Sequence, residues 1–386
     1  MIVAFGTYDA ARHPRIGVLV AGLRAHGHVV HELDRPLGLS TAQRVRMLRE
    51  PWRLPVLLVR LLRCWALLVG DAVRHRRRHG RPDAVLVGYL GHFDVVLARL
   101  LFGRTPVLLD HLVFAGDTAT DRGARGARVT ALRALDRLAV ACADVVLLDT
   151  AEHARMLGEL VPSRARRGLV VPVGAPQDWF DAAPSAGRAA GLADDGTRPL
   201  RLVFFGLFTP LQGTDVLAAA LARALPRAAA DGAQGGRRIE VTLVGAGQDL
   251  PAARALLRDV PGVTWLGWVD PAELPGLVAA HDVCLGIFSA TPKGLRVVPN
   301  KVFQGLAAGC VVVTSDTAPQ RRHLGDHVEL VPPADPAALA GRLLALRDPV
   351  TLAAARARAA SGRGLARPAA VVEPLVRLLA SRGVRP

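Results

Sequence analysis

Hydrophobic residues occur along the chain in short runs that alternate with longer amphipathic segments. Runs such as Ile2–Phe5 and Val145–Leu148 are rich in β-branched and aliphatic residues, which is typical of parallel strands buried on both faces. A helical pattern follows the first run at Ile16–His26, and a second strand follows it at His28–Leu33. A strand, helix and parallel strand in this order form a right-handed βαβ unit. The pattern therefore predicts an α/β protein with parallel sheets.

The alternation of strands and helices occurs twice along the chain. The expected strands are 2–5, 28–33, 84–87, 106–109, 145–148 and 169–173 in the first half, and 202–205, 239–244, 263–266, 283–287, 310–314 and 328–331 in the second. Residues 181–199 between them are mostly small residues, Pro and Gly, which is typical of a linker or hinge. We predict Rossmann-like domains at 1–180 and 200–365, with a helix in 366–386 that crosses back to the first domain.

Residue chemistry predicts several helix boundaries. Asp94 and Asn300 are expected to be N-caps, because their side chains can accept hydrogen bonds from free backbone N–H groups. Pro226 is expected to end a helix in the second half, because proline lacks a backbone N–H. A short helix is expected at Val302–Ala308, with a buried strand directly after it.

The stretch 291–316 combines three cations with a helix start. Lys293, Arg296 and Lys301 lie on either side of the helix entry at Pro299-Asn300. A helix N-terminus presents free N–H groups and about half a positive charge. A phosphate or diphosphate is therefore the natural ligand. The alternative is a solvated basic loop before an ordinary helix.

The loops that follow the strands of the first half are the next candidates. In an open parallel sheet, ligands bind at the carboxyl ends of the strands. We therefore expect the loops Gly6–Asp9, Gly88–His92, Asp110–Asp117 and Asp149–Glu152 to face one cleft.

Composition and charge narrow the class of partner. The chain is 51% hydrophobic and 21% charged, as in globular proteins. Its net charge of +16 and pI of about 11.3 favour nucleic acid, an anionic membrane surface or phosphorylated substrates. Aromatic residues make up only 4% of the chain and form no recognition cluster, so we expect no nucleic-acid partner. The high arginine content is also typical of a GC-rich genome.

Cysteine and histidine spacing gives no metal-binding motif. The four cysteines, Cys64, Cys142, Cys284 and Cys310, lie far apart in apolar runs, which favours reduced thiols in a cytoplasm. The N-terminus lacks the pattern of a secretion signal, and no uninterrupted apolar stretch of about 18 residues occurs. We therefore expect a cytoplasmic protein without a metal site. A bacterial source and the absence of a cofactor are further expectations.

Residues 51–80 predict a basic amphipathic helix. At about 100° per residue one sector of this helix collects most of its arginines: Arg53, Arg60, Arg63, Arg74 and Arg78. Trp52 and Trp65 accompany a broad Leu/Val surface, and such a helix can lie on the anionic inner face of a plasma membrane. The alternative is a domain helix with one solvated arginine face, because Asp71 shares that sector and Pro55 and Gly70 interrupt the helix.

The whole chain resembles the GT-B glycosyltransferases, and more narrowly the retaining enzymes of group 1, family 4. The most specific piece is VPNKVFQGLAAGCVVVTSD at 298–316, which resembles that family's helix and strand beneath the sugar nucleotide. The end of the family's first domain resembles PVGA at 172–175. Its first loop of the second domain resembles GLFTPLQGTDVL at 206–217, and its strand before the donor loop resembles HDVCLGIF at 281–288. The resemblance implies two Rossmann-like domains facing across a cleft, with a nucleotide-diphosphate sugar as co-substrate.

The resemblance also assigns residues to the site. The implied donor-binding residues are Gly6, Thr7, Gly206, Phe208, Gln212, Gly213, Gly245, Trp268, Val269, Lys293, Arg296, Asn300, Lys301 and Gln304. Asp110 and His111 would orient the acceptor or the sugar as catalytic residues, and His92 and Asp117 are candidates on the acceptor side. Each has a structural alternative, such as a loop hydrogen bond for Asp110 and a packed loop histidine for His111.

Two departures from the family pattern affect the donor site. The family's loop arginine and lysine are replaced by Leu207 or Phe208 and by Gln212, so the diphosphate would be neutralised by the three cations of 291–316. The family's Glu-x7-Glu pair is replaced by Arg296 and Gln304. Gln304 can still hydrogen-bond a ribose hydroxyl through its amide, but Arg296 cannot act as a carboxylate beside the sugar.

The resemblance thus implies a metal-independent, retaining glycosyltransferase. It would move a sugar from a nucleotide sugar to a glycan, a lipid-linked sugar or a small molecule, in the cytoplasm or peripherally on the inner membrane face. One alternative is another GT-B enzyme, such as a sugar-nucleotide epimerase or a phosphorylase. A second is a non-catalytic sugar-nucleotide-binding partner subunit, which the missing acidic pair favours.

Overall fold

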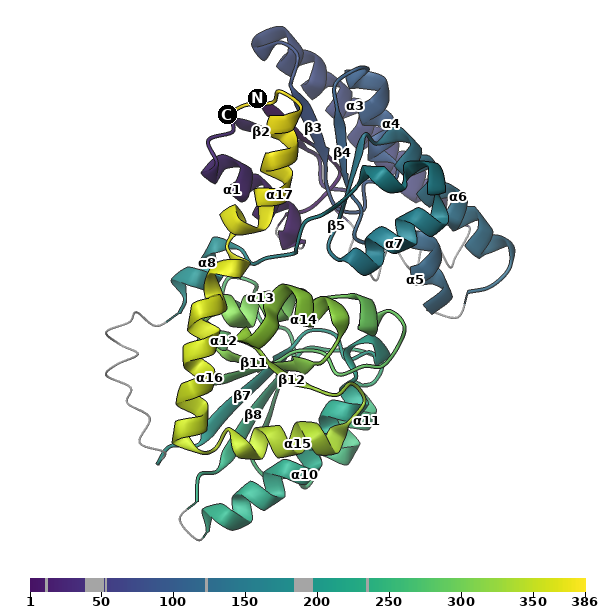
Figure 1. Cartoon of the computed structure of the whole chain (residues 1–386). Coiled ribbons are helices and arrows are strands. Elements are labelled where there is room, and N and C mark those ends of the chain that lie inside the picture. Colours follow the sequence, from purple (N-terminus) through teal and green to yellow (C-terminus); the bar gives the residue numbers. More distant parts are fainter. Residues whose placement is uncertain (11–12, 39–51, 53, 122–123, 184–196, 234–235) are drawn as a thin grey trace. The chain divides into compact units, whose positions relative to one another are not determined.

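The computed structural model describes the chain except for residues 11–12, 39–51, 53, 122–123, 184–196 and 234–235 (Figure 1). Arg53 and most of the predicted linker at 181–199 therefore lie outside the described residues. The chain divides into two compact units. Unit 1 consists of Met1–Pro172 and Val371–Pro386, and unit 2 consists of Val173–Ala370.

Unit 1 contains a parallel sheet of six described strands in the order β2-β1-β3-β4-β5-β6. The strands are β1 Ile2–Gly6, β2 Val30–Asp34, β3 Ala84–Val87, β4 Val107–Asp110, β5 Val145–Leu148 and β6 Gly168–Val170. The helices are α1 Pro14–Ala25, α3 Leu54–His79, α4 Asp94–Phe102, α5 Ala115–Asp121, α6 Ala127–Cys142, α7 Ala151–Leu160 and α17 Pro368–Ser381. The chain reverses its direction of winding between β1 and β3, which makes their carboxyl ends a topological switch point.

Alternate residues of the unit 1 strands face opposite layers of helices. Ile2 and Ala4 pack with α1 and α17, whereas Val3 and Phe5 pack with α3, α4 and α6. Helix α17 contributes Val371, Val372, Leu375 and Leu379 to this core, although it follows unit 2 in the chain. The continuous apolar runs of these strands therefore reflect burial on both faces.

Unit 2 contains a second parallel sheet, with described strands in the order β12-β11-β10-β7-β8-β9. The strands are β7 Leu200–Phe205, β8 Ile239–Val244, β9 Val263–Leu266, β10 Val283–Leu285, β11 Val311–Ser315 and β12 Glu329–Val331. The helices are α8 Gln177–Asp181, α10 Thr214–Gly232, α11 Leu250–Leu256, α12 Leu274–Ala279, α13 Asn300–Ala307, α14 Ala318–Leu324, α15 Pro336–Ala345 and α16 Pro349–Gly362. This is the strand order of a doubly wound dinucleotide-binding sheet, with its switch point between β7 and β10.

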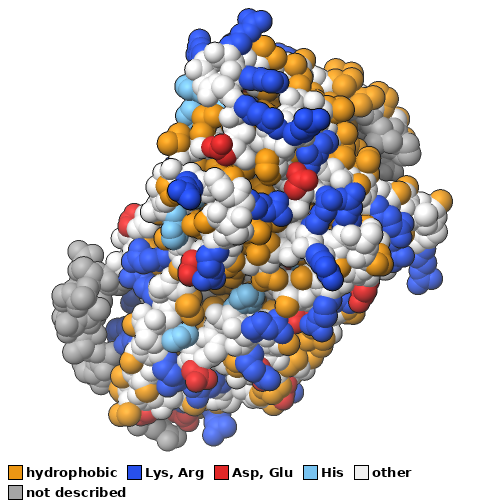
Figure 2. All heavy atoms as spheres, turned by 45° about the horizontal axis from the view of Figure 1, so that its top comes forward, with side chains coloured by type: hydrophobic (Ala, Val, Ile, Leu, Met, Phe, Trp, Pro, Cys, Tyr) orange, Lys and Arg blue, Asp and Glu red, His pale blue; other side chains and the backbone are white. Residues whose placement is uncertain are grey.

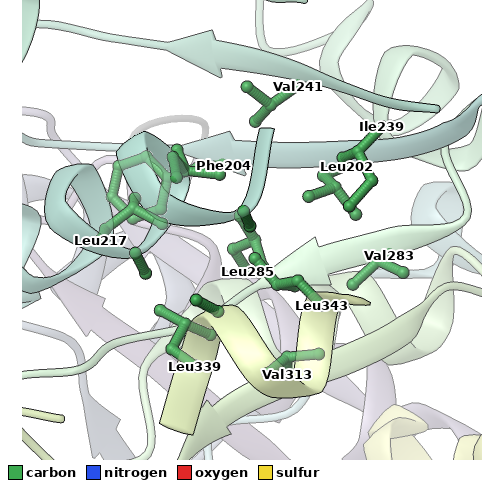
Figure 3. Packing of buried hydrophobic residues seen from close by; sticks show 14 of the residues in the cluster. Leu202, Phe204, Leu217, Ile239, Val241, Val283, Leu285, Val313, Leu339 and Leu343 are labelled. Carbon is green, nitrogen blue, oxygen red and sulfur yellow. The ribbon is translucent and has the colours of Figure 1, made fainter. Parts of the chain in front are cut away.

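Residues of β7 alternate between two cores in the same way. Phe204 lies in one core with Leu217 of α10 and Leu339 of α15 (Figure 3). Val203 and Phe205 pack on the other face, in the core that includes α8 and α13. The predicted α/β fold with two Rossmann-like parallel sheets is confirmed by this arrangement.

The division between the units falls at Pro172 rather than at the expected residue 180. Ala175, Trp179 and Phe180 are buried in the core of unit 2, and the Trp179 ring stacks on Phe205 with centroids 5.5 Å apart. The segment from Val173 to Phe180 therefore packs as part of unit 2, because its aromatic side chains find their apolar partners there.

Both expected N-caps occupy a different position. Asp94 and Asn300 are the first residues of α4 and α13, and Phe93 and Pro299 stand at the N-cap without a side-chain hydrogen bond. The Asp94 carboxylate instead binds partners outside its own helix. Asn300 is exposed beside Pro299, whose own ring sets a dihedral suited to a helix entry.

Three residues expected to break helices do not do so. Pro226 lies inside α10, and Leu225 and Ala228 on either side of it are both buried. Continued burial of this apolar face offsets the hydrogen bond that proline cannot donate. Pro55 lies in the first turn of α3, where no intrahelical donor is needed, and α3 continues through Gly70.

Candidate functional site

Two glycine loops meet at the carboxyl ends of β7 and β8. Gly206 N–H donates to the Val244 carbonyl and Phe208 N–H donates to the Ala246 carbonyl, both at 3.0 Å. Gly245 has a φ of +131°, and a Cβ at this position would lie 1.9 Å from the Gly206 oxygen. Only glycine fits between these backbones. The approach keeps the carboxyl end of β7 clear of side chains from the β8 loop.

A buried ammonium lies beside the β7 loop. Lys301 of α13 is 5% exposed, and its Nζ lies 3.6 Å from the centroid of the Phe204 ring. The same nitrogen lies 3.4 Å from the point where a Cβ on Gly206 would stand. Among the described residues it has no hydrogen-bond partner. Burial lowers the pKa of Lys301 from 10.5 to about 7, so the side chain is only partly protonated near neutral pH. An anion at this loop would favour its ammonium form.

Helix α13 holds Lys301 in this position. Val302, Phe303 and Leu306 bury one face of the helix in the core of unit 2. Gly305 lets the helix approach β10, because a Cβ there would lie 2.6 Å from the Cys284 side chain. The first turn therefore points its free N–H groups toward the carboxyl edge of the sheet, where they add to the positive potential.

The β7 loop itself contributes backbone rather than side chains. Phe208 is 1% exposed, and its ring packs 5.2 Å from Phe204 and 5.9 Å from Trp265. The Phe208 side chain is therefore part of the core, and the donor contact of Phe208 stays a prediction. Gln212 is half-buried with an unpartnered Oε1 among the described residues, and Gly213 adopts a left-handed φ of 66°.

The remaining predicted donor residues of unit 2 differ in exposure. Trp268 is 86% exposed and Val269 is half-buried in the loop after β9. Lys293 and Arg296 are half-buried in the segment before α13. Gln304 is only 9% exposed in α13, so its amide is close to the protein interior.

A cavity of about 640 Å³ lies next to these loops. It is lined by residues of α10 and α11 and by Ser289, Ala290 and Thr291. Of the predicted donor residues it includes Gly213 and not Lys301. We therefore build the anion site on Lys301 and the glycine loop, because the unpaired charge lies there.

In unit 1, the loop after β1 is held by a carboxylate. Both the backbone N–H and the hydroxyl of Thr7 donate to Asp94 Oδ2, at 2.7 and 2.8 Å. The Trp65 indole donates to Asp94 Oδ1 at 2.8 Å. Gly6 passes close to this carboxylate, since a Cβ there would lie 3.0 Å from Asp94 Oδ2. Asp94 therefore positions the Gly6–Thr7 loop, a role that sequence reasoning missed.

Asp110 is part of a buried ion pair. Its carboxylate is buried, and Oδ1 accepts a hydrogen bond from Arg15 Nε at 2.7 Å. Arg15 also donates to the carbonyls of Val171 and Pro172. Burial raises the pKa of Asp110, and the Arg15 charge opposes that rise. This ion pair gives Asp110 a structural role, and its catalytic role stays a prediction.

His92 and His111 converge on Asp136, which sequence reasoning also missed. His92 Nε2 lies 3.0 Å and His111 Nε2 lies 3.8 Å from Asp136 Oδ1. The carboxylate also accepts the backbone N–H groups of Ala115 and Gly116 at the start of α5. Asp136 thus fixes the short helix that carries Asp117, which is half-buried.

Burial and hydrogen bonds together set the protonation of this cluster. Burial lowers the pKa of His111 to about 3, so that imidazole is neutral near pH 7. Although burial favours the protonated carboxyl, hydrogen bonds from His92, Gly116 and Ala115 lower the pKa of Asp136. Ligand atoms of the two histidines and Asp136 lie within 4.8 Å of one another. Because Asp136 already accepts three hydrogen bonds, we describe this group as a hydrogen-bonded network.

Comparison with solved structures defines the class of fold. HepE from Anabaena, solved with UDP and glucose, superposes with a TM-score of 0.61 at 15% identity and 99% coverage of both chains. Sucrose-phosphate synthase from Thermosynechococcus elongatus superposes with a TM-score of 0.65 at 17% identity, covering 99% of this chain and 98% of that one. A trehalose-6-phosphate structure from E. coli, bound with UDP-2-fluoro glucose, gives 0.64 at 14% identity and 98% coverage of both. The chain has the GT-B fold.

Comparison of sequences then relates part of the chain to a known family. Residues 199–348, which lie within unit 2, match the family described as glycosyl transferases group 1. D-inositol 3-phosphate glycosyltransferase of Geodermatophilus obscurus is 31% identical over 229 residues, which are 56% of this chain. The match spans 49% of that relative's length. The predicted resemblance to group 1 enzymes is confirmed.

Proposed function

We propose that this protein is a glycosyltransferase that moves a sugar from a nucleotide-diphosphate sugar to an acceptor hydroxyl. The observation that carries the proposal is the buried, unpartnered ammonium of Lys301 beside the glycine loop that follows β7. It lies at the switch point of the sheet, within the segment that matches the group 1 family. HepE, one of the structural neighbours, was solved with UDP-glucose, which supports a sugar nucleotide as the ligand class.

The proposed mechanism is metal-independent transfer with retention. The developing charge on the leaving diphosphate is stabilised by Lys301 and by the free N–H groups of the first turn of α13. Lys293 and Arg296 lie in the segment just before this turn and add positive charge. The Gln304 amide bonds a ribose hydroxyl, and the base lies against the loops at Gly245 and Trp268-Val269. The missing family acids thus alter sugar contacts rather than phosphate binding.

Unit 1 supplies the acceptor side in this proposal. The Gly6–Thr7 loop, which Asp94 holds, lies under the reacting sugar. The neutral His111 imidazole and the Asp117 carboxylate are the groups that orient hydroxyls. Acceptor candidates are a glycan, a lipid-linked sugar or a small molecule. The relative from Geodermatophilus obscurus is named for D-inositol 3-phosphate, which supports a phosphorylated small molecule as one acceptor candidate.

A thermal-shift screen against UDP-, GDP-, ADP- and dTDP-sugars tests the donor. A true donor at 100 times its Kd stabilises the fold by about 2.7 kcal/mol through mass action. Lys301→Met should lose this shift, because it removes the charge and keeps an apolar chain of similar length. Gly267→Ala is the matched control on the same sheet edge, since nothing lies within 4 Å of its added Cβ. No shift with any sugar nucleotide would contradict the proposal.

Turnover separates the transferase from its alternatives. Consumption of the donor only in the presence of an acceptor supports glycosyl transfer, and the anomeric configuration of the product tests retention. A new sugar nucleotide formed from the donor alone indicates an epimerase. Stable binding without any turnover indicates a sugar-nucleotide-binding subunit.

We also propose a cytoplasmic location with peripheral contact to the inner face of the plasma membrane. The net charge of +16 and the arginine-rich helix α3 support this location, because anionic lipid attracts basic surfaces.

A further inference from the structure

The N-terminal half of α3 exposes an unusual group of large apolar side chains. Their exposed fractions are 49% for Val56, 55% for Leu58, 66% for Val59 and 50% for Leu62. Trp52, just before the helix, is 72% exposed. Single exposed apolar residues are ordinary on protein surfaces, whereas a contiguous group marks an interaction surface.

The opposite face of α3 is the one that packs on unit 1. Leu68 and Ala72 are buried in the core beneath the helix, with Phe5 and Val95 in the same cluster. Trp65 is half-buried, and its indole donates to Asp94. Trp65 therefore faces the protein, which corrects the expectation that both tryptophans accompany an outer surface. The exposed group is an additional face of a helix that is already anchored.

The same helix is strongly basic. Arg60, Arg63, Arg74 and Arg78 are exposed, and the last turn contains Arg76, Arg77, Arg78 and His79. Its one carboxylate, Asp71, is already bound by Arg35 at 2.7 Å and by Arg74 at 2.5 Å. Figure 2 shows Lys and Arg side chains alongside hydrophobic ones over the upper part of the molecule, which belongs to unit 1.

We propose that the N-terminal half of α3 docks into an anionic phospholipid bilayer. Leu58, Val59 and Leu62 enter the boundary between headgroups and acyl chains, and Arg60 and Arg63 bind lipid phosphates. The proposal rests on the peripheral location proposed above and not on the transfer chemistry. Within the described ranges, every helix is too short or too polar to cross a bilayer.

Charge favours a bilayer over a second copy of this chain as the occupant. An isologous dimer through α3 would place the arginines of both copies against one another, and like charges across an interface disfavour association. An anionic lipid surface supplies the opposite charge along the whole length of the helix.

Docking at α3 would also favour the lipid-linked sugar among the acceptor candidates. The Trp65–Asp94–Thr7 hydrogen bonds join α3 directly to the Gly6–Thr7 loop within unit 1. A bilayer bound to α3 therefore lies at a fixed place relative to that loop, which is where the proposed acceptor side begins.

Vesicle flotation of the full chain tests the docking surface. We expect the wild type to float with vesicles containing phosphatidylglycerol and to bind pure phosphatidylcholine much more weakly. Leu62→Glu should weaken binding about tenfold or more, because it removes an apolar side chain that the lipid would bury and adds a charge that anionic lipid repels. Leu138→Glu on α6 is the matched control, since Leu62 and Leu138 are both 50% exposed, and it should bind as the wild type does.

A second pair of variants tests the charge. Arg60→Gln with Arg63→Gln should weaken binding to anionic vesicles by roughly fivefold for each arginine, with a smaller effect at high salt. Arg223→Gln with Arg227→Gln removes two exposed arginines of α10 in unit 2 and should change nothing. Circular dichroism establishes that each variant is folded.

Three results would overturn the docking proposal. These are a wild type that does not float with anionic vesicles, a Leu62→Glu protein that floats as well as Leu138→Glu, and a vesicle-free dimer that Leu62→Glu dissociates. The donor-induced thermal shift, measured without vesicles, should be the same in all of these variants. A wild type that does not bind vesicles but shows the donor-induced thermal shift contradicts only the docking proposal. A wild type without a donor-induced thermal shift contradicts the proposed function.

Discussion

Replacing Lys301 by methionine should make the protein more stable and at the same time unable to hold the donor. The ammonium is buried beside the Phe204 ring and has no hydrogen-bond partner among the described residues. Methionine keeps an apolar chain of similar length and removes the charge. Lys301→Met therefore removes a desolvated cation that, in our proposal, binds the donor diphosphate.

The size of this effect follows from the pKa of Lys301. Burial lowers that pKa from 10.5 to about 7. At about 1.4 kcal/mol per unit the shift corresponds to roughly 5 kcal/mol, and relaxation around the group reduces it to about 2–5 kcal/mol. Between these two pKa values the unfolded chain binds a proton that the folded chain does not, so wild-type stability rises with pH. The penalty is complete below pH 7 and absent above pH 10.5.

Urea unfolding of both proteins at several pH values measures this difference. Lys301→Met should be more stable than the wild type at pH 6.5, and the two free energies of unfolding should converge as the pH approaches 10. A saturating sugar nucleotide should stabilise the wild type and leave Lys301→Met unchanged. Equal stability of the two proteins at every pH, or a less stable variant, would refute the assignment of Lys301 as an uncompensated buried cation.

Three further predictions concern the loops and the buried charges. Gly245→Ala should destabilise the fold by about 2–4 kcal/mol in thermal unfolding, because the new Cβ meets the β7 loop backbone at a positive φ, whereas Gly267→Ala should change it little. Arg15→Met should lower the free energy of unfolding by about 3–5 kcal/mol, since it leaves the buried Asp110 unpaired. The double variant Arg15→Met, Asp110→Leu should recover this stability, and an equal loss in both variants would contradict the pairing. Because the pKa of His111 is lowered to about 3, the wild type should lose up to about 1.4 kcal/mol of stability for each pH unit below 6.5. His111→Phe should lose less stability over this range. An unchanged dependence of stability on pH would show that His111 is not the group responsible.

The strands were predictable because both of their faces are buried. Runs such as Ile2–Phe5 and Val145–Leu148 contain only residues that suit a doubly covered parallel sheet, and each became a strand. Lys301 was predictable in part, because a cation beside a helix entry is a local pattern. The burial of Lys301 against Phe204 could not be predicted, since β7 lies far from α13 in the sequence.

The supporting carboxylates could not be predicted for the same reason. Asp94 binds Thr7, which is 87 positions away, and Asp136 accepts from His92, which is 44 positions away. The local sequence therefore indicates a cap at Asp94, and Asp136 has no local feature that distinguishes it from other helical acids. Phe208 shows the opposite case, because its place in a glycine loop indicated ligand contact while its ring packs in the core.

Calorimetric titration of UDP, GDP and ADP into the wild type and Lys301→Met tests the central claim most directly. An anion beside Lys301 should raise its pKa from about 7, so binding at pH 8 should take up close to one proton. Buffers with different ionisation enthalpies report that uptake. We predict that one nucleotide binds the wild type with proton uptake, and that Lys301→Met loses most of the affinity and all of the uptake. Binding of equal strength to both proteins, or without proton uptake, would contradict the claim that Lys301 holds the donor diphosphate.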